Sequence, residues 1–432
     1  MAVRTLLNRH ALCAASLFLA ACTAGARDGS TRELRVWAFG PEGEALGPMV
    51  RDFERDNPDI HVHVQQIPWT AAHEKLLTAF VGGALPDVAQ LGNTWIPEFA
   101  ALRALAPLDS ALSRDSARMP RDDYFPGVLA TNVVDDTLYG IPWYVDTRVM
   151  FYRADLLRRA GVAHAPTTWA EWRDALVQVK RVQPAGSFPM LMPLDEWAQP
   201  VILGLQSGAP LLADDGTRGF FRDPRFRRGF EFYIALFRAG LAPALANTQI
   251  SNVYQEFAAG RTAMYITGPW NVGEFRKRLP DSLQSAWATA ALPGENGPGA
   301  SLAGGSSLVM MRRARDPSDA LRFIAFLSDP ARQAAFYAAT GDLPARRSAW
   351  NAPRLANDPY LVAFREQLAR IEPTPPVAEW ELIATDIAAA AERVARGTQS
   401  TDAALAALDR QVDGILEKRR WLRSRRTIAA AQ

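Results

Sequence analysis

The sequence predicts an α/β fold of the doubly wound kind with a mainly parallel sheet, in a chain long enough for two lobes. Short apolar segments that suit buried strands are each followed by a segment with helical spacing of apolar residues. Strand and helix alternate in this way three times within about 70 residues. The chain beyond the first 22 residues, roughly 400 residues, exceeds the size of one compact domain, so we expect two lobes.

The first elements follow from local patterns. The sequence LRVWAF is almost wholly apolar, and IHVHVQQ alternates as a half-buried strand does. Asn57-Pro58-Asp59 breaks the helix between them. The expected elements are the strands 34–39, 60–66 and 88–91 and the helices 42–55, 70–82 and from about 94. Further along, the expected strands are 149–152 and 263–267 and one entered from 302–311, and the expected helices are 168–182, 317–328, 330–340 and an Ala-rich region over 379–420.

The first 21 residues predict an export signal. Arg4 and Arg9 give a short positive region, and a mostly apolar stretch leads to Ala21. This stretch is too short and too interrupted for a stable membrane span. Leu19-Ala20-Ala21-Cys22 resembles the lipobox of bacterial lipoproteins, which implies cleavage before Cys22, its lipidation, and a tether over 22–32. An ordinary signal peptide and a short anchor that is never cut are the alternatives.

Composition and motifs disfavour several classes of function. Both cysteines, Cys13 and Cys22, lie in or at the edge of the signal, so the exported part has no thiol for a disulfide, a metal or catalysis. The formal charge of +2 falls to about zero without the signal, so no nucleic-acid partner is expected. We find no phosphate loop, dinucleotide fingerprint, HExxH or nucleophile elbow, and expect no cofactor, metal or catalytic residue. A glycosidase needs only two carboxylates, and the sequence leaves that alternative open.

Tryptophan placement points to ligand binding. All 12 tryptophans follow the signal, and Trp37, Trp69 and Trp95 lie at or just beyond the ends of three successive strands. In open α/β sheets the ligand crevice lies beyond the carboxyl ends of the strands. Aromatic rings in such a crevice suit flat amphipathic ligands such as sugars. We therefore expect these tryptophans to contact a ligand, with a core position as the alternative, above all for Trp37.

Six segments carry a family resemblance: VGGALPDVAQLGNTWIPEFAALRALAPLD (81–109), YGIPWYVDTRVMFYRADLLRRAG (139–161), TTWAEW (167–172), GRTAMYITGPWNVGEF (260–275), LAGGSSLVMM (302–311) and DALRFIAFLSDPARQAAFYAATGDLPARRSAW (319–350). They resemble the family 1 extracellular solute-binding proteins, which are the sugar-binding lipoproteins or periplasmic proteins of ABC importers. Within that family they are similar to segments of maltose- and trehalose-binding proteins. They span most of the chain after the signal in the family's order.

The resemblance implies two α/β lobes that are joined by crossing segments and bind sugar between them. Lobe one would comprise 33–142 and 305–345, and lobe two 147–300 and 352–425. The crossings would lie near 142–147, 302–307 and 345–352.

The resemblance also indicates ligand-binding residues. Trp270, in the turn Gly268-Pro269-Trp270, is the strongest stacking candidate, and Trp380 and Trp197 match cleft positions of lobe two. The polar and backbone candidates lie near strand ends and crossings; a cap, a turn or a hinge hydrogen bond is the alternative for each. They are Asp87, Asn93, Thr94, Glu42, Glu44, Tyr144, Asp146, Gly304, Gly305 and Arg346.

The expected function is capture of a di- or oligosaccharide, of the maltose or trehalose type, by an exported, lipid-anchored monomer that delivers it to a membrane permease. Aromatic planes match the apolar face of a sugar ring, and carboxylates, amides and arginine match its hydroxyls. An exported glycan-processing enzyme is one alternative. The same fold with a non-sugar ligand, such as a glycerol phosphodiester, a polyamine or a cation complex, is another.

Overall fold

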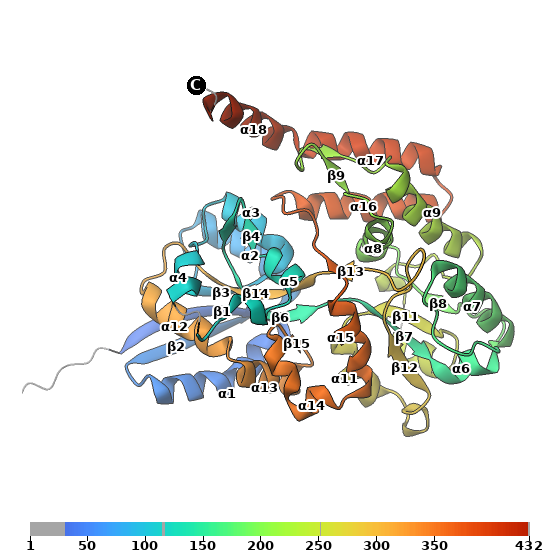
Figure 1. Ribbon diagram of the computed structural model, residues 1–432, viewed down its shortest axis with the longest axis horizontal. Coiled ribbons are helices and arrows are strands. Elements are labelled where there is room, and N and C mark those ends of the chain that lie inside the picture. Colours follow the sequence, from blue (N-terminus) through green and yellow to red (C-terminus); the bar gives the residue numbers. More distant parts are fainter. Residues whose placement is uncertain (1–30, 115–116, 251, 431–432) are drawn as a thin grey trace, which may run out of the picture.

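The computed structural model describes residues 31–114, 117–250 and 252–430, with side chains up to residue 425. The predicted signal, Cys22 and most of the predicted tether lie outside these residues. Two lobes lie side by side, each with a sheet and surrounding helices (Figure 1). No helix in the described part of the chain is long and apolar enough to span a membrane.

The first lobe holds a six-stranded sheet in the order β15-β6-β14-β3-β1-β2. Its strands are β1 Arg32–Phe39, β2 Ile60–Ile67, β3 Val88–Gly92, β6 Ile141–Asp146, β14 Gly304–Met310 and β15 Leu343–Pro344. β1 pairs in parallel with β2 and β3, whereas β14 and β15 run antiparallel to their neighbours. The expectation of a mainly parallel sheet is therefore wrong, because β14 and β15 begin at the edge where the other four strands end.

The second lobe holds a four-stranded sheet in the order β12-β7-β11-β8. Its strands are β7 Val149–Arg153, β8 Met190–Leu191, β11 Met264–Thr267 and β12 Trp287–Ala290. Only β11 and β8 pair in parallel there, so this sheet is mixed as well. The three smaller ladders join β4 Val133–Val134 to β5 Thr137–Leu138, β9 Leu212–Ala213 to β10 Arg218–Gly219, and β13 Ser301–Leu302 to β16 Ile371–Glu372.

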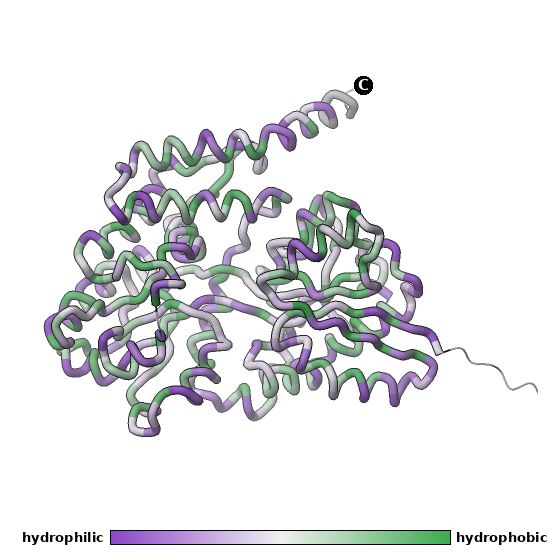
Figure 2. The backbone as a smooth tube through the Cα atoms, turned by 180° about the vertical axis from the view of Figure 1, so that it is seen from behind, coloured by the Kyte–Doolittle hydropathy of each residue, from purple (hydrophilic) through white to green (hydrophobic). Residues whose placement is uncertain are grey.

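Amphipathic helices cover both sheets, with polar and apolar residues alternating along them (Figure 2). In the first lobe they are α1 Gly40–Asp56, α2 Trp69–Val81, α3 Ile96–Ala101, α4 Asp109–Arg114, α5 Pro126–Ala130, α12 Pro317–Leu327 and α13 Pro330–Thr340. In the second lobe they are α6 Ala154–Arg159, α7 Trp169–Val182, α8 Ala198–Gln206, α9 Pro224–Arg238, α10 Val253–Ala258, α11 Trp270–Arg278, α15 Val362–Leu368, α16 Trp380–Ala395, α17 Thr401–Ile415 and α18 Glu417–Ala430.

Three segments connect the lobes. β6 leads into β7 and so from the first sheet to the second, and β14 returns beside it. Between them, the backbone N–H of Arg148 donates to Ser301 Oγ at 3.1 Å, and that hydroxyl donates to the carbonyl of Arg148 at 2.9 Å. The third connection leaves β15 through α14 Pro353–Ala356 and reaches α15. Just before α15, the Tyr360 carbonyl accepts from Thr289 Oγ1 of β12 at 2.7 Å. The sheets are thus held by hydrogen-bonded connections and not by a single linker.

Buried clusters fill each lobe. One lies in the second lobe between its sheet and α7, α8, α9, α16 and α17, and includes Trp172 and Trp380. The other two lie against the first sheet, and one of them continues to Phe151 and Trp287 of the second lobe. Trp143, Trp169, Trp172, Trp287 and Trp350 are core residues.

Candidate functional site

A hydrogen-bond network joins the first turns of α1 and α2 to buried side chains of β3, β6 and β14. Trp69 Nε1 donates to both carboxylate oxygens of Glu42 at 3.2 Å, and Tyr144 Oη donates to Glu42 Oε1 at 2.9 Å. Gln90 Nε2 donates to Tyr144 Oη at 3.1 Å and to Ser306 Oγ at 3.2 Å. Burial raises the pKa of Glu42, although its hydrogen bonds from its own backbone, Tyr144 and Trp69 act to lower it. This network fixes one carboxylate and one phenol at the inner edge of the first lobe.

Aromatic rings flank this carboxylate. Trp69 and Trp95 meet edge to face with ring centroids 5.7 Å apart, and Phe39 packs against both at 5.1 and 5.9 Å. Trp69 and Trp95 are half-buried, unlike most tryptophans of the chain. Gly40 makes this possible: it has a φ of +52°, and a Cβ on it would lie 2.6 Å from Trp69 Cδ1.

The second lobe faces the network with a cation and an indole. Arg148 is ion-paired with Asp146 at the end of β6, and its guanidinium lies 4.7 Å from the ring centroid of Trp270. Burial acts to lower the pKa of Arg148, but the charge of Asp146 and the hydrogen bond to it leave the pKa raised. Trp270, 37% exposed, folds back over Gly268, where a Cβ would lie 2.0 Å from its Cζ3. Gly268-Pro269-Trp270 is thus a turn that only glycine permits.

Asp342 completes the junction from the first lobe. It follows Gly341, where a Cβ would lie 3.7 Å from Cα of Trp270, so the lobes meet here. Burial, and then the negative charges of Glu42 and Asp146, raise the pKa of Asp342 well above its usual value. We call the six residues Glu42, Trp69, Tyr144, Arg148, Trp270 and Asp342 the interlobe site.

A second contact between the lobes lies beside the interlobe site. His73 Nε2 and Glu98 Oε2 lie 2.6 Å apart, and the hydrogen bond raises the pKa of His73. Glu381, at the start of α16 in the second lobe, reaches Thr94 and the charge of His73. Burial raises the pKa of Glu381, and these two partners act to lower it. Thr94 therefore contributes to the contact between the lobes.

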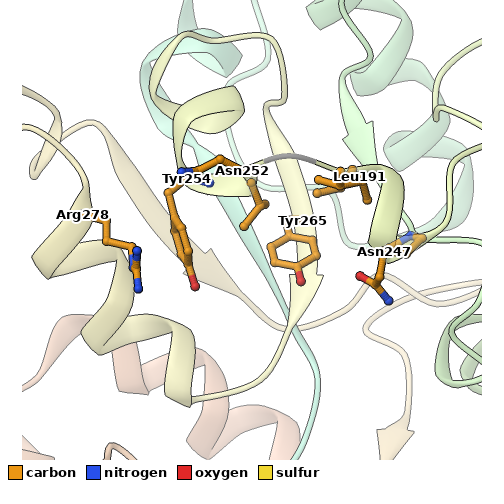
Figure 3. Close-up of a pocket in the computed structure, with 9 residues that line it drawn as sticks. Leu191, Asn247, Asn252, Tyr254, Tyr265 and Arg278 are labelled. Carbon is orange, nitrogen blue, oxygen red and sulfur yellow. Dashed lines mark hydrogen bonds between the residues drawn. The ribbon is translucent and has the colours of Figure 1, made fainter.

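A pocket of about 320 Å³ opens next to the interlobe site on the second lobe. Tyr254 and Tyr265 point into it from α10 and β11, with Asn247 on one side and Arg278 on the other (Figure 3). Burial raises the pKa of Tyr265, as does the charge of Glu196, whereas Arg148 acts to lower it. Tyr254 Oη donates to Oδ1 of Asn271, the residue after Trp270, at 2.8 Å, so the pocket adjoins the interlobe site. The pocket offers two aromatic faces beside amide and guanidinium groups.

The structure brings together several of the predicted residues. Glu42, Trp69, Tyr144, Asp146 and Trp270 lie in or directly against the interlobe site. Trp95 packs on Trp69. Trp197 is half-buried, follows Glu196 and directly precedes α8. Asn93 is buried and donates to the Ala303 carbonyl at 2.5 Å. This hydrogen bond joins the end of β3 to the segment between β13 and β14. Glu44 is exposed and accepts from Gln66 at 3.2 Å.

Other predicted positions have structural roles. Trp37 is buried in a core cluster of the first lobe. Trp380 is 1% exposed and lies in the core of the second lobe. Its ring packs edge to face against that of Trp197, with the ring centroids 5.6 Å apart. Gly304 and Gly305 allow close approach to the backbone of β6, since Cβ atoms there would lie 2.5 Å from the Asp146 carbonyl and 2.3 Å from that of Tyr144.

Two charged candidates, Asp87 and Arg346, form hydrogen bonds with residues away from the interlobe site. Asp87 precedes β3 and so lies at the opposite edge of the sheet, which corrects the expectation that it lies by the strand's end. Its buried carboxylate accepts from the Arg35 amide at 2.8 Å and from Arg315 Nη2 at 2.8 Å. Arg346 is buried and donates to Asp123 Oδ2 at 2.5 Å and to the Ser328 carbonyl at 3.1 Å. Both residues stabilise loops of the first lobe.

Sequence reasoning missed Arg148, Asp342, Gln90 and Glu381. Arg148 stands two residues after Asp146 on the same connection, and Asp342 follows the glycine that ends α13, which were usable signals. Gln90 sits inside an apolar strand, where a polar residue indicates a buried hydrogen bond. Glu381 had no local signal. Among the described residues, no group of three or more His, Cys, Asp or Glu side chains could hold a metal ion.

Comparisons with known proteins identify the family of the chain. The family model described as "Bacterial extracellular solute-binding protein" matches residues 39–334. The structure of the sugar-binding protein MalE from Xanthomonas citri is 50% identical, with a TM-score of 0.88, and the match covers 91% of this chain and 99% of that one. The galactooligosaccharide-binding protein of Bacillus subtilis is 28% identical over 91% of this chain and 93% of its own length. The diacetylchitobiose-binding protein DasA of Streptomyces coelicolor is 23% identical, with 92% of each chain covered. The chain therefore belongs to the bacterial extracellular solute-binding protein family.

Proposed function

We propose that this protein is the substrate-binding component of an ABC importer and that it binds a di- or oligosaccharide at the interlobe site. The observation that carries the proposal is the meeting of the two lobes at Gly341 and Trp270. Glu42, Tyr144 and Asp342 lie on the first lobe there, and Arg148 and Trp270 lie on the second. The 50% identity to a sugar-binding MalE over almost the whole of both chains supports it.

The chemistry of the site suits a hydroxyl-rich ligand with an apolar face. Trp270 and the Trp69–Trp95 pair present ring faces or edges, and each stacked sugar ring contributes roughly 0.5–1.5 kcal/mol beyond its buried area. Carboxylates accept from hydroxyls, and Arg148 donates to them. A micromolar site needs about 8 kcal/mol. Two or three stacks and several charge-assisted hydrogen bonds can supply this after the cost of ordering and desolvation. The neighbouring tyrosine pocket gives room for a second ring or more, which favours a di- or oligosaccharide.

The proposed mechanism is lobe closure. The three connections form the hinge, with lobe one near 33–142 and 305–345 and lobe two near 147–300 and 352–425. A sugar that touches both walls favours the closed state, which a membrane permease would recognise. The protein performs no chemistry on the sugar. It acts as a monomer outside the cytoplasm, held at a membrane by acyl chains on Cys22.

Two other functions would each require particular groups at the interlobe site. An exported glycan-processing enzyme would use the same aromatic residues, and two facing carboxylates, such as Glu42 and Asp342, are what it would need. A glycerol phosphodiester would need cations at the site, where Arg148 is already paired with Asp146. The predominance of carboxylates and indoles therefore favours a neutral sugar.

The test is a fluorescence titration of a chain that starts at residue 23 with maltose, trehalose, sucrose, lactose, cellobiose and monosaccharides, with product analysis on the same samples. We expect a saturable change in tryptophan emission and intact sugar. Release of product would establish an enzyme, and the absence of any response would move the ligand out of the sugar class.

A further inference from the structure

The C-terminal helix leaves the body of the protein. α18, Glu417–Ala430, follows α17 and projects beyond the second lobe toward the side of the first (Figure 1). Its described side chains, 417–425, include five basic residues and one acidic residue. The helix is separate from the interlobe site, so a role for it is independent of the proposed sugar ligand.

One face of α18 contacts other segments of the chain. Arg420 donates to the carbonyls of Thr217 at 2.8 Å and Asp413 at 3.1 Å. Arg419 lies 3.8 Å from Glu379. Arg423 lies 3.9 Å from Asp135, in the β4–β5 turn, and 3.9 Å from Asp215, in the β9–β10 turn. These contacts account for three of the basic residues.

The opposite face is exposed and amphipathic. Lys418, Trp421, Leu422 and Arg425 have the spacing i, i+3, i+4 and i+7, which places them on one side of a helix. Trp421 is 52% and Leu422 46% exposed. The Arg425 guanidinium lies 4.4 Å from the ring centroid of Trp421. We call these four residues the outer face of α18.

An exposed tryptophan is exceptional in this chain. The other tryptophans lie in a core, at the interlobe site or beside it, as Trp95 and Trp197 do. An indole and a leucine that are exposed side by side, with a cation on either side along the helix, form an apolar patch of the kind that marks an interaction site. Basic residues that flank an indole and an aliphatic side chain are typical of helices that lie in a membrane interface.

We propose that the outer face of α18 docks on the anionic phospholipid surface of a membrane. Lys418 and Arg425 are attracted to the headgroup charges, and Trp421 and Leu422 enter the boundary between headgroups and acyl chains. A single acyl chain binds a membrane only weakly, so a basic helix is the kind of second signal that makes anchoring stable. The predicted lipid at Cys22 would bring the helix within reach of such a surface.

The test measures vesicle binding by flotation. The chain used starts at residue 23, which removes only residues outside the described structure and leaves both sheets and all three cores. Vesicles of mixed phosphatidylglycerol and phosphatidylcholine are compared with pure phosphatidylcholine, at low and high salt. We expect binding to the anionic vesicles that salt weakens. Because each basic residue near an anionic surface contributes roughly a fivefold factor, K418Q together with R425Q should lower the partition coefficient about 30-fold.

Matched variants separate the outer face from general surface effects. W421A with L422A should reduce binding, whereas L382A, at an exposed leucine of α16, should not. R173Q with R181Q, at two exposed arginines of α7, controls for loss of charge. Equal binding to neutral and anionic vesicles, binding to neither, or unchanged binding by K418Q/R425Q would overturn the proposal. So would self-association without lipid that W421A/L422A abolishes, because that would assign the face to a second copy of the chain. Sugar titrations of the same variants report on the interlobe site separately.

Discussion

At the scale of single residues, the proposed site consists of side chains that are held in place by their neighbours. Trp270 is kept over Arg148 by a glycine turn, and Arg148 is kept by Asp146. Glu42 is fixed by two donors from separate elements. The interlobe site is therefore preorganised on the first lobe and completed by the second, which lowers the cost of ordering it when a ligand binds.

Removal of the Trp270 ring should weaken sugar binding. Trp270→Ala loses a stacking surface, which we expect to cost about 1–2 kcal/mol, or roughly five- to thirtyfold in Kd. Calorimetric titration measures it. Trp421→Ala, at the other tryptophan that is more than one third exposed, is the control and should leave Kd unchanged. Retained affinity in Trp270→Ala would remove this residue from the site.

The buried carboxyl of Asp342 should cost stability. Its folded-state pKa is raised, so between its unfolded and folded pKa values the native state binds the extra proton and stability falls as pH rises. Asp342→Asn should raise the free energy of unfolding at neutral pH by about 1–3 kcal/mol and flatten its decline with pH. Urea unfolding across the acidic to neutral range measures this. Asp174→Asn, at an exposed site of α7, should change neither quantity; an unaltered pH slope in Asp342→Asn would contradict the assignment.

At the scale of elements, the connections between the lobes are the most constrained part of the fold. β14 and β6 pair so closely that Gly305, at φ +131°, has the Tyr144 carbonyl where a Cβ would be. Each lobe can remain rigid while the few residues around this crossing absorb rotation. The second sheet depends on the same region, because Arg148 and Ser301 bond across it.

A side chain at Gly305 should destabilise the crossing. We expect Gly305→Ala to lower the free energy of unfolding by about 1–3 kcal/mol, since the Cβ would lie 2.3 Å from a backbone oxygen. Gly273→Ala is the matched control: Gly273 is an exposed residue within α11 with nothing near its Cβ position, and the change should stabilise by about 0.5–1 kcal/mol. Denaturant unfolding compares the two, and equal stabilities would refute the close approach at Gly305.

Strands and helices could be predicted from the sequence where neighbouring residues alone determine them. The strands at 34–39, 60–66 and 88–91 and the helix at 168–182 match β1, β2, β3 and α7, because apolar period and the cap Thr168 act within a few residues. The antiparallel direction of β14 and β15 was not predictable, since it depends on which edge a distant segment enters. The glycine turn before Trp270 was found from sequence. Asp342 was missed although the glycine that ends α13 marks its position. Glu381 reaches the junction only through tertiary packing, so no local pattern marks it.

At the scale of the whole molecule, the protein is two lobes whose facing walls carry complementary chemistry. The first offers carboxylates, a phenol and paired indoles, and the second offers a guanidinium, an indole and the tyrosine pocket. Neither wall alone surrounds a ligand, so occupancy and closure should be coupled. Glu381 of the second lobe and Thr94 of the first add a contact between the lobes.

The most direct test of sugar-driven lobe closure is the distance between the lobes with and without sugar. A chain starting at residue 23 contains no native cysteine, so spin labels on V81C of the first lobe and Q178C of the second report only that distance. We expect a broad distribution in the free protein that narrows and shortens with at least one maltose- or trehalose-type sugar, and that stays broad in Trp270→Ala at the same sugar concentration. A folded, labelled protein whose distances no sugar changes would contradict closure around a sugar.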